Sequence, residues 1–98
     1  MTKIVFVMSL FFLQNLLLAQ DIERGKIIFK TCIQCHGPDG MGMKEQEAPS
    51  IKSQHSWYIE SSIKAFKSGE RKNPKMLPYI KGLSDSDIRD VAAYVNQM

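Results

Sequence analysis

The chain has 98 residues, of which 44% are hydrophobic and 23% are charged, and its formal charge is +3. A chain of this length holds one small domain, and so weak a positive charge does not indicate a protein that binds nucleic acid. A domain of this size buries a modest core and often needs a disulfide, a metal or a cofactor to stabilise it.

Residues 1–19 are typical of a secretory signal peptide. Lys3 precedes a mostly apolar run, and no acidic residue occurs before Asp21. This is the basic start and apolar centre of an export signal, and Ala19 supplies the small residue expected before the cut. Polar residues interrupt the run, so a retained membrane anchor is the weaker interpretation. We expect residues 20–98 to form an exported, periplasmic domain, whose charge falls to +2 once Lys3 is lost with the leader.

The first part of the mature chain predicts a helix and then a loop, with no alternating strand pattern. Asp21 is the expected N-cap of a first helix over residues 22–33. Gly25 lies inside this helix, where glycine costs about 1 kcal/mol relative to alanine, so we expect another helix to cross closely there. Residues 37–53 contain three glycines and two prolines, which predicts a loop.

The second part of the mature chain predicts two more helices. One covers residues 56–66, and a loop follows over residues 67–82 because of its glycines and prolines. The last helix has the clearest start, since Ser84 and Asp87 resemble a capping box. An apolar stripe then continues along it, formed by Ile88, Val91, Ala92 and Val95.

The segment "KTCIQCHGPDG", residues 30–40, contains both cysteines of the chain. On a helix, positions i, i+3 and i+4 face the same side, so Cys32, Cys35 and His36 project toward one volume. A flat macrocycle there could be bonded at its edge by both sulfurs while the imidazole reaches the metal at its centre. C-x-x-C-H is the mark of such c-type haem attachment.

Three other uses of a cysteine pair fit less well. A zinc site needs about four ligands, and His55 is the one further histidine in the chain. A thioredoxin-like dithiol would need a βαβ framework, which the pattern does not predict. A disulfide between such close neighbours would restrain little of the unfolded chain.

A second axial ligand decides between electron transfer and substrate chemistry. After the leader, the chain has four methionines: Met41, Met43, Met76 and Met98. The first two follow His36 too closely to pass round the ring, and the last is the C-terminal residue. Met76 comes 40 residues after His36, in a loop restrained by two prolines, so we expect it to bind the iron. His55 is the alternative sixth ligand.

In order along the mature chain, five segments resemble those of the small bacterial class I cytochromes c. They are "GKIIFKTCIQCHG", "GPDGMG", "APSIKSQHSWYI", "FKSGERKNPKM" and "LSDSDIRDVAAYV". The resemblance implies an all-α fold, with three to four helices around one covalently attached haem c and its iron. It also implies that the first and last helices cross, so that Gly25 and Phe29 meet Tyr94 and Val91.

The resemblance assigns further residues to the surroundings of the haem. It implies that the carbonyl of Pro49 accepts the proton of the His36 imidazole, a bond that fixes the ring. Three residues match partners of the haem propionates: Gln54, Trp57 and Arg71. The sequence departs from the family at Lys52 and Ser53, where relatives tend to have small or apolar residues, and this puts the packing of that loop in question.

We therefore expect a monomeric, single-haem carrier that passes one electron between redox proteins, is not an enzyme, and meets membranes only through partner complexes. Six cations within Lys64–Lys81 surround Met76: Lys64, Lys67, Arg71, Lys72, Lys75 and Lys81. They form either a docking face for acidic partner surfaces or an ordinary solvated surface. Two alternative functions remain at this point. One is a haem subunit of a larger oxidase or dehydrogenase, and the other is a haem protein with an open sixth position for peroxide or gas.

Overall fold

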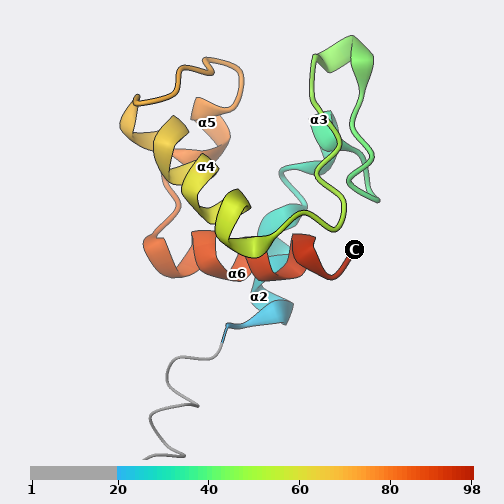
Figure 1. Cartoon of the computed structure of the whole chain (residues 1–98), viewed down its shortest axis with the longest axis vertical. Helices are drawn as coiled ribbons and strands as arrows, with labels where there is room; N and C mark the ends of the chain where they lie inside the picture. Colours follow the sequence, from blue (N-terminus) through green and yellow to red (C-terminus); the bar gives the residue numbers. More distant parts are fainter. Residues whose placement is uncertain (1–19) are drawn as a thin grey trace, which may run out of the picture.

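The computed structural model describes residues 20–98, which form helices and connecting loops (Figure 1). The helices described are α2 (Ile22–Phe29), α3 (Ile33–His36), the 3₁₀ turn η1 (Lys44–Gln46), α4 (Ser56–Ser68), α5 (Leu77–Ile80) and α6 (Asp85–Asn96). Within this range the only β-type pairing is an isolated bridge between Met43 and Ala48, which confirms the all-α class. None of these helices combines the length and apolarity needed to span a bilayer. The predicted leader, residues 1–19, lies outside the described part.

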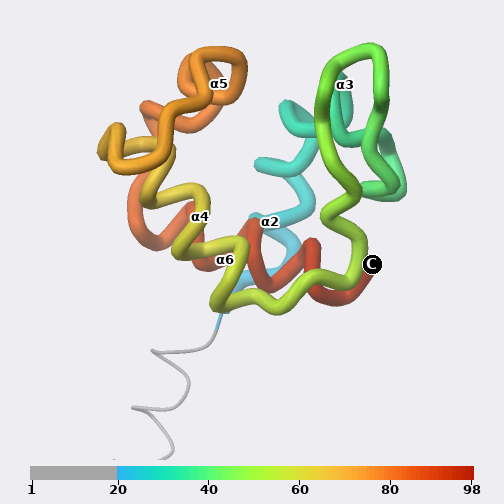
Figure 2. The backbone as a smooth tube through the Cα atoms, turned by 45° about the horizontal axis from the view of Figure 1, so that its top comes forward, coloured from blue at the N-terminus to red at the C-terminus, as the bar shows by residue number. Residues whose placement is uncertain are grey.

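The first and last described helices, α2 and α6, cross in close contact, as Figure 1 and Figure 2 both show. Gly25 makes this approach possible, because a Cβ atom there would lie 2.1 Å from the carbonyl oxygen of Asp90 and 2.9 Å from Cβ of Tyr94. The Phe29 and Tyr94 rings pack beside this point, with centroids 5.4 Å apart. Phe29 and Val91 are each 2% exposed in the same core. The predicted crossing is confirmed.

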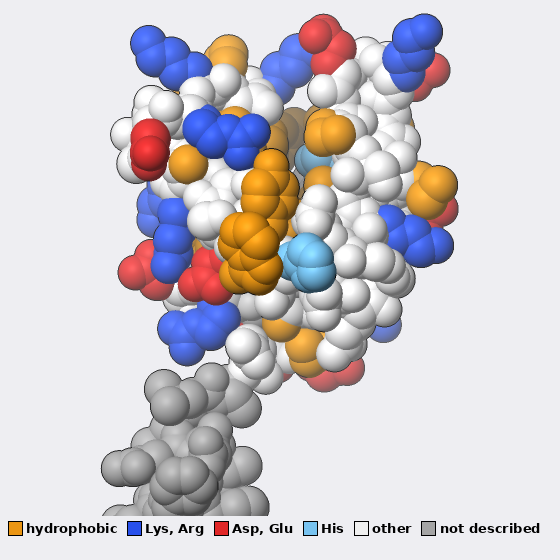
Figure 3. Space-filling view, in the orientation of Figure 1, with side chains coloured by type: hydrophobic (Ala, Val, Ile, Leu, Met, Phe, Trp, Pro, Cys, Tyr) orange, Lys and Arg blue, Asp and Glu red, His pale blue; other side chains and the backbone are white. Residues whose placement is uncertain are grey.

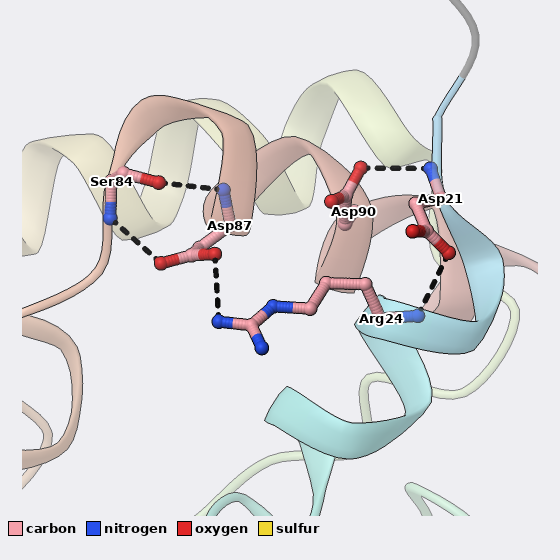
Figure 4. A network of polar contacts seen from close by, with 5 residues as sticks. All are labelled: Asp21, Arg24, Ser84, Asp87 and Asp90. Atoms are coloured by element: carbon pink, nitrogen blue, oxygen red, sulfur yellow. Dashed lines mark hydrogen bonds and ion pairs between the residues drawn. The ribbon is translucent and has the colours of Figure 1, made fainter.

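Polar contacts at the helix starts hold this crossing in place (Figure 4). The Ser84 hydroxyl accepts from the Asp87 backbone N–H, and the Asp87 carboxylate accepts from the Ser84 N–H, each at 3.1 Å. This confirms the predicted capping box, and Asp21 caps α2 by accepting from the Arg24 N–H at 3.0 Å. Two contacts join the helices: Arg24 to the Asp87 carboxylate at 3.4 Å, and the Asp21 N–H to the Asp90 carboxylate at 2.9 Å.

The remaining longer helix, α4, and the short α5 pack in succession on α6. α4 packs on α6, and α5 packs on α4, so the helix contacts run in the order α2, α6, α4, α5. The buried apolar residues form one cluster between them: Ile28, Phe29, Ile59, Ile63, Ile80, Ile88, Val91, Ala92 and Val95. In Figure 2, α3 and α5 lie on two separate arms above this base. We call residues 30–53 the proximal arm and residues 56–83 the distal arm.

The first helix differs from the predicted range of 22–33. α2 ends at Phe29, and the chain tightens before α3 because the N–H groups of Lys30, Thr31 and Cys32 each bond the carbonyl three residues earlier. The Thr31 hydroxyl also donates to the Ile28 carbonyl at 3.0 Å. Bonds of this i to i−3 type and a back-bonding threonine both interrupt a regular α-helix.

Two smaller differences occur in the distal arm. α4 continues to Ser68, two residues past the predicted end, and stops where Gly69 adopts the left-handed conformation with φ 85°. α5 forms inside the predicted loop although Pro78 is part of it. Pro78 lies in the first turn of α5, where no intrahelical bond needs its missing N–H.

Candidate functional site

Both thiols and the imidazole of the C-x-x-C-H motif belong to one helical turn. The His36 N–H bonds the Cys32 carbonyl at 2.9 Å, and the Cys35 N–H bonds the same carbonyl at 3.3 Å. The predicted shared face therefore survives, although the turn belongs to the short α3 and not to the first helix. Both thiols are free and half-buried, and burial raises the pKa of Cys32 above its usual value.

The His36 ring is buried, at 7% exposure, and is fixed by the proximal arm. Its Nδ1 lies 2.9 Å from the carbonyl oxygen of Pro49. Because a carbonyl can only accept, Nδ1 is the donor in this contact, and in a neutral ring Nε2 then keeps its lone pair. The structure thus brings Pro49 to the predicted place, and a nitrogen able to bind a metal remains on the other side of the ring.

A glycine that the sequence analysis did not single out makes this contact possible. Gly42 has φ 87°, and its N–H donates to the His36 carbonyl at 2.8 Å. A Cβ atom at this position would lie 2.7 Å from backbone atoms of Ala48, Pro49 and Ser50. The chain can fold back against Pro49 only with glycine there. The repeated glycines of "GPDGMG" were the available signal.

A cavity of about 380 Å³ lies between the two arms. The residues that line it include Cys32, His36, Pro49, Ile51, Gln54, Tyr58, Ile63, Phe66, Arg71, Met76 and Ile80. A smaller cavity of about 70 Å³ shares Cys32, His36 and Met76 with it and extends to Cys35. We call this smaller cavity the cysteine-side cavity. A thiol pair, an imidazole and a thioether in an otherwise mostly apolar lining are the ligands and surroundings that a covalently held haem requires. The residues present fit the group.

Met76 lines both cavities from the distal arm, opposite the arm that carries His36. Its N–H donates to the Asn73 side-chain oxygen at 3.2 Å, so the turn before α5 holds its backbone. His55, the alternative sixth ligand, and Met41, which the sequence excluded, lie elsewhere. Met41 is 57% exposed, and His55 stacks on Trp57 with ring centroids 6.1 Å apart. Neither of them lines the cavity.

Of the three residues matched to the propionates, the structure brings two to the cavity wall. Gln54 lines it, as does Arg71, whose guanidinium lies 4.4 Å from the Phe66 ring centroid. Trp57 is 67% exposed and does not line the cavity. Its neighbour Tyr58 does, together with Ser62 and Phe66. Each of these three residues follows the previous one by four positions on α4. This spacing places them on one face of the helix and could have predicted that they line the cavity together.

The loop that departs from the family pattern packs against the C-terminus of the chain. Ser53 adopts a left-handed φ of 59°, its N–H donates to the Val95 carbonyl at 3.3 Å, and its hydroxyl donates to the Met98 carbonyl. The Lys52 N–H donates to the Gly40 carbonyl at 3.1 Å. Neither residue lines either cavity.

Four of the six cations in the predicted docking cluster are engaged with other groups. The Arg71 guanidinium donates to the Ser62 hydroxyl at 3.1 Å, and the other three are lysines. Lys64 pairs with Glu60 at 3.1 Å, Lys67 donates to the Leu83 carbonyl at 2.5 Å, and Lys75 pairs with Glu47 at 3.0 Å. On the face shown in Figure 3, apolar side chains and a histidine gather along the middle, and side chains of both charge signs surround them. This face is therefore mixed in charge.

Comparison with known sequences agrees with this site. The family model described as Cytochrome c matches residues 22–98. Cytochrome c-554(548) of Halomonas halodenitrificans is 44% identical over 79 residues, which cover 78% of this chain and 94% of that protein. Cytochrome c-553 of Helicobacter pylori is 33% identical, covering 97% and 96%. The cytochrome subunit of sulfide dehydrogenase of Chlorobaculum tepidum is 33% identical, covering 78% and 67%.

Two solved structures share the fold. Cytochrome c4 of Acidithiobacillus ferrooxidans has a TM-score of 0.72 at 30% identity, and thiosulfate dehydrogenase (TsdBA) of Marichromatium purpuratum has 0.75 at 28%. The matches cover 79% and 80% of this chain, but the chain spans only 49% and 19% of those two proteins. With the family model and the relatives above, they establish that the chain belongs to the cytochrome c family, as a small class I c-type cytochrome that carries electrons on covalently attached haem c and its iron.

Proposed function

We propose that this protein is an exported, single-haem electron carrier in which His36 and Met76 bind the iron from opposite sides. The observation that supports this most directly is that His36 and Met76, which belong to opposite arms, line the same two cavities, and that both cysteines line the smaller of these. Bound haem supplies a one-electron couple between ferric and ferrous iron. Cys32 and Cys35 attach it, and the Pro49 carbonyl orients the His36 ring.

The roles of these residues suit electron transfer better than catalysis. A thioether ligand favours reduced iron and raises the potential. With His36 and Met76 both bound, no position is open to a substrate, so we propose that the protein is not an enzyme. Gln54 and Arg71, which line the cavity, are proposed partners of the propionates. For Trp57 this role would require its exposed indole to turn toward the cavity.

We also propose that residues 1–19 are a leader that is cut after Ala19. The mature domain would then be residues 20–98, located in the periplasm. The basic, then apolar pattern of the first residues supports this. Attachment of this haem type occurs outside the cytoplasm, which agrees with export. An intact mass of the purified protein reports the mature start and the bound haem together.

The absorption spectrum of the purified holo-protein tests the ligand assignment. We expect the weak red band of sulfur ligation in the ferric form and no change when carbon monoxide is added to the reduced form. Met76→Ala should abolish the band and admit carbon monoxide, whereas His55→Ala should leave both properties unchanged. A high-spin ferric wild-type protein that binds carbon monoxide readily would instead support the open-site alternative.

The partners are proposed to be redox proteins with acidic surfaces, such as a dehydrogenase that passes electrons to this chain. Two proteins similar to this chain, the sulfide dehydrogenase subunit and thiosulfate dehydrogenase, support a partner of that class. Size exclusion of the native material separates a free monomer from a docked subunit.

Lys72 and Lys81 are the cluster lysines most available for docking, since the side chain of neither makes a hydrogen bond or ion pair within residues 20–98. We expect Lys72→Glu to slow reduction by an acidic partner at low salt, because it reverses a charge that steers encounter. Lys26→Glu, which makes the same change on α2, is the control and should have little effect. Equal rates for wild type and Lys72→Glu at all ionic strengths would remove the docking proposal.

A further inference from the structure

Two side-chain contacts join the proximal and distal arms directly. The ammonium of Lys75 lies 3.0 Å from Oε1 of Glu47, and the Tyr79 hydroxyl donates to Oε1 of Gln34 over a long 3.5 Å. No other hydrogen bond or ion pair within residues 20–98 links residues 30–53 to residues 56–83. The arms are otherwise joined through the crossing of α2, from which the proximal arm continues, with α6, on which α4 of the distal arm packs.

The residues of the ion pair belong to the lining of the cysteine-side cavity. Glu47 and Lys75 both line it, together with the two cysteines. Lys75 directly precedes Met76, and Glu47 lies two residues before Pro49. The pair therefore connects the segment that carries the distal thioether with the segment whose carbonyl fixes the His36 ring.

The backbone at Glu47 is held in an uncommon conformation. Its φ is 55° at the end of η1, and Met43 and Ala48 bond each other on either side of this turn at 3.0 and 3.1 Å. A residue with a long side chain rarely adopts a left-handed φ, and glycine would do so more easily. The strained residue in this loop is thus the one whose carboxylate reaches Lys75.

We propose that Glu47 and Lys75 are positioning residues: their ion pair holds the Met76 segment against the proximal arm and limits how often the Met76 thioether leaves the iron. This rests on the proposed function, since it requires Met76 as the ligand. Both side chains are largely exposed, at 81% for Glu47 and 56% for Lys75, so the pair is modest in strength and sensitive to salt.

Binding of imidazole to the ferric holo-protein measures this directly, because imidazole can bind only when Met76 is displaced. Its apparent affinity then follows the fraction of molecules with Met76 released. We expect Lys75→Gln and Glu47→Gln each to tighten imidazole binding by about 1.5- to 5-fold, the range for an exposed ion pair. The double variant should match the single variants, since either change breaks the same contact.

Matched controls come from neighbouring charges. Lys72→Gln and Glu45→Gln remove a like charge close by without breaking an ion pair, and should bind imidazole as the wild type does. Rising ionic strength should tighten binding in the wild type and in these controls, but not in Lys75→Gln or Glu47→Gln. The reversed pair, Glu47→Lys with Lys75→Glu, should return binding toward the wild-type value.

Glu47→Gly separates the charge from the backbone strain. It removes the carboxylate while relieving the left-handed φ, so it should bind imidazole as Glu47→Gln does without unfolding more easily. If Lys75→Gln and Glu47→Gln match Lys72→Gln and Glu45→Gln while the wild type keeps its sulfur band, the positioning role is wrong and the ligand assignment stands. If the wild type has no such band, the ligand assignment fails, and the positioning role fails with it.

Discussion

The backbone of α6 leaves no room for a side chain at Gly25. A Cβ atom there would lie 2.1 Å from the Asp90 carbonyl oxygen, which is backbone and cannot move without shifting α6. We expect Gly25→Ala to destabilise the holo-protein by about 1–3 kcal/mol or more, as overpacking does. Denaturant unfolding followed by circular dichroism measures this. The control is Gly82→Ala, whose added Cβ has no neighbour within 4 Å. Equal losses in both variants would contradict the crossing as the cause.

The residues that sequence alone could place are those whose geometry is local. Cys32, Cys35 and His36 share a face because one helical turn sets their positions, whatever surrounds it. Of the two adjacent aromatic residues on α4, Tyr58 lines the cavity and Trp57 does not. The local sequence pattern does not distinguish them. Only the position of α4 beside the other arm decides which of them lines it.

At the scale of elements, the start of α6 is fixed by its own capping residues. The Ser84 N–H donates to the Asp87 carboxylate, and this bond chiefly lowers the pKa of Asp87, with a further contribution from Arg24. A carboxyl whose pKa is lower in the folded state stabilises the fold above its unfolded pKa of about 3.9, and this stability is lost as the pH falls through the folded value.

We therefore expect Asp87→Asn to cost about 1 kcal/mol at neutral pH and less as the pH drops below about 4. Urea unfolding of the holo-protein at several pH values measures the difference. Asp85→Asn changes a first-turn carboxylate that makes no side-chain hydrogen bond within the described range, so it serves as the control. An Asp87→Asn deficit that stays constant down to the most acidic pH would contradict this role.

Helices were predictable where their ends carry their own signals. Asp21 and Ser84 are such signals, and α2 and α6 begin after them. Gly69 ends α4, but the predicted end of that helix, residue 66, fell two residues short of the observed one. α5 has no capping side chain and contains Pro78, so pattern alone assigned it to a loop. Its place is set by packing on α4 and by buried Ile80, which are contacts that form only in the folded chain.

At the scale of the whole molecule, the cavity depends on both arms and so could not be read from any one segment. Its walls combine Cys32 and Pro49 with Ile63 and Met76, which are far apart in sequence. These residues also belong to or adjoin the hydrophobic core, since Cys32 and Met76 pack against the cluster that contains Ile63. If this cavity holds the haem as proposed, the haem completes the core of the domain, and haem and fold should be stable only together.

Removal of the haem tests this coupling. Without haem, the apolar residues that line this cavity of about 380 Å³ lose the contacts that the ring supplies, and a small domain has little stability to spare. We expect Cys32→Ser with Cys35→Ser, and equally the leaderless wild-type chain made without haem attachment, to lose cooperative thermal unfolding and much of their helical circular dichroism. The second sample controls for the serine substitutions, because it keeps both cysteines. A sharp transition near that of the holo-protein in either sample would show that the arms close without haem.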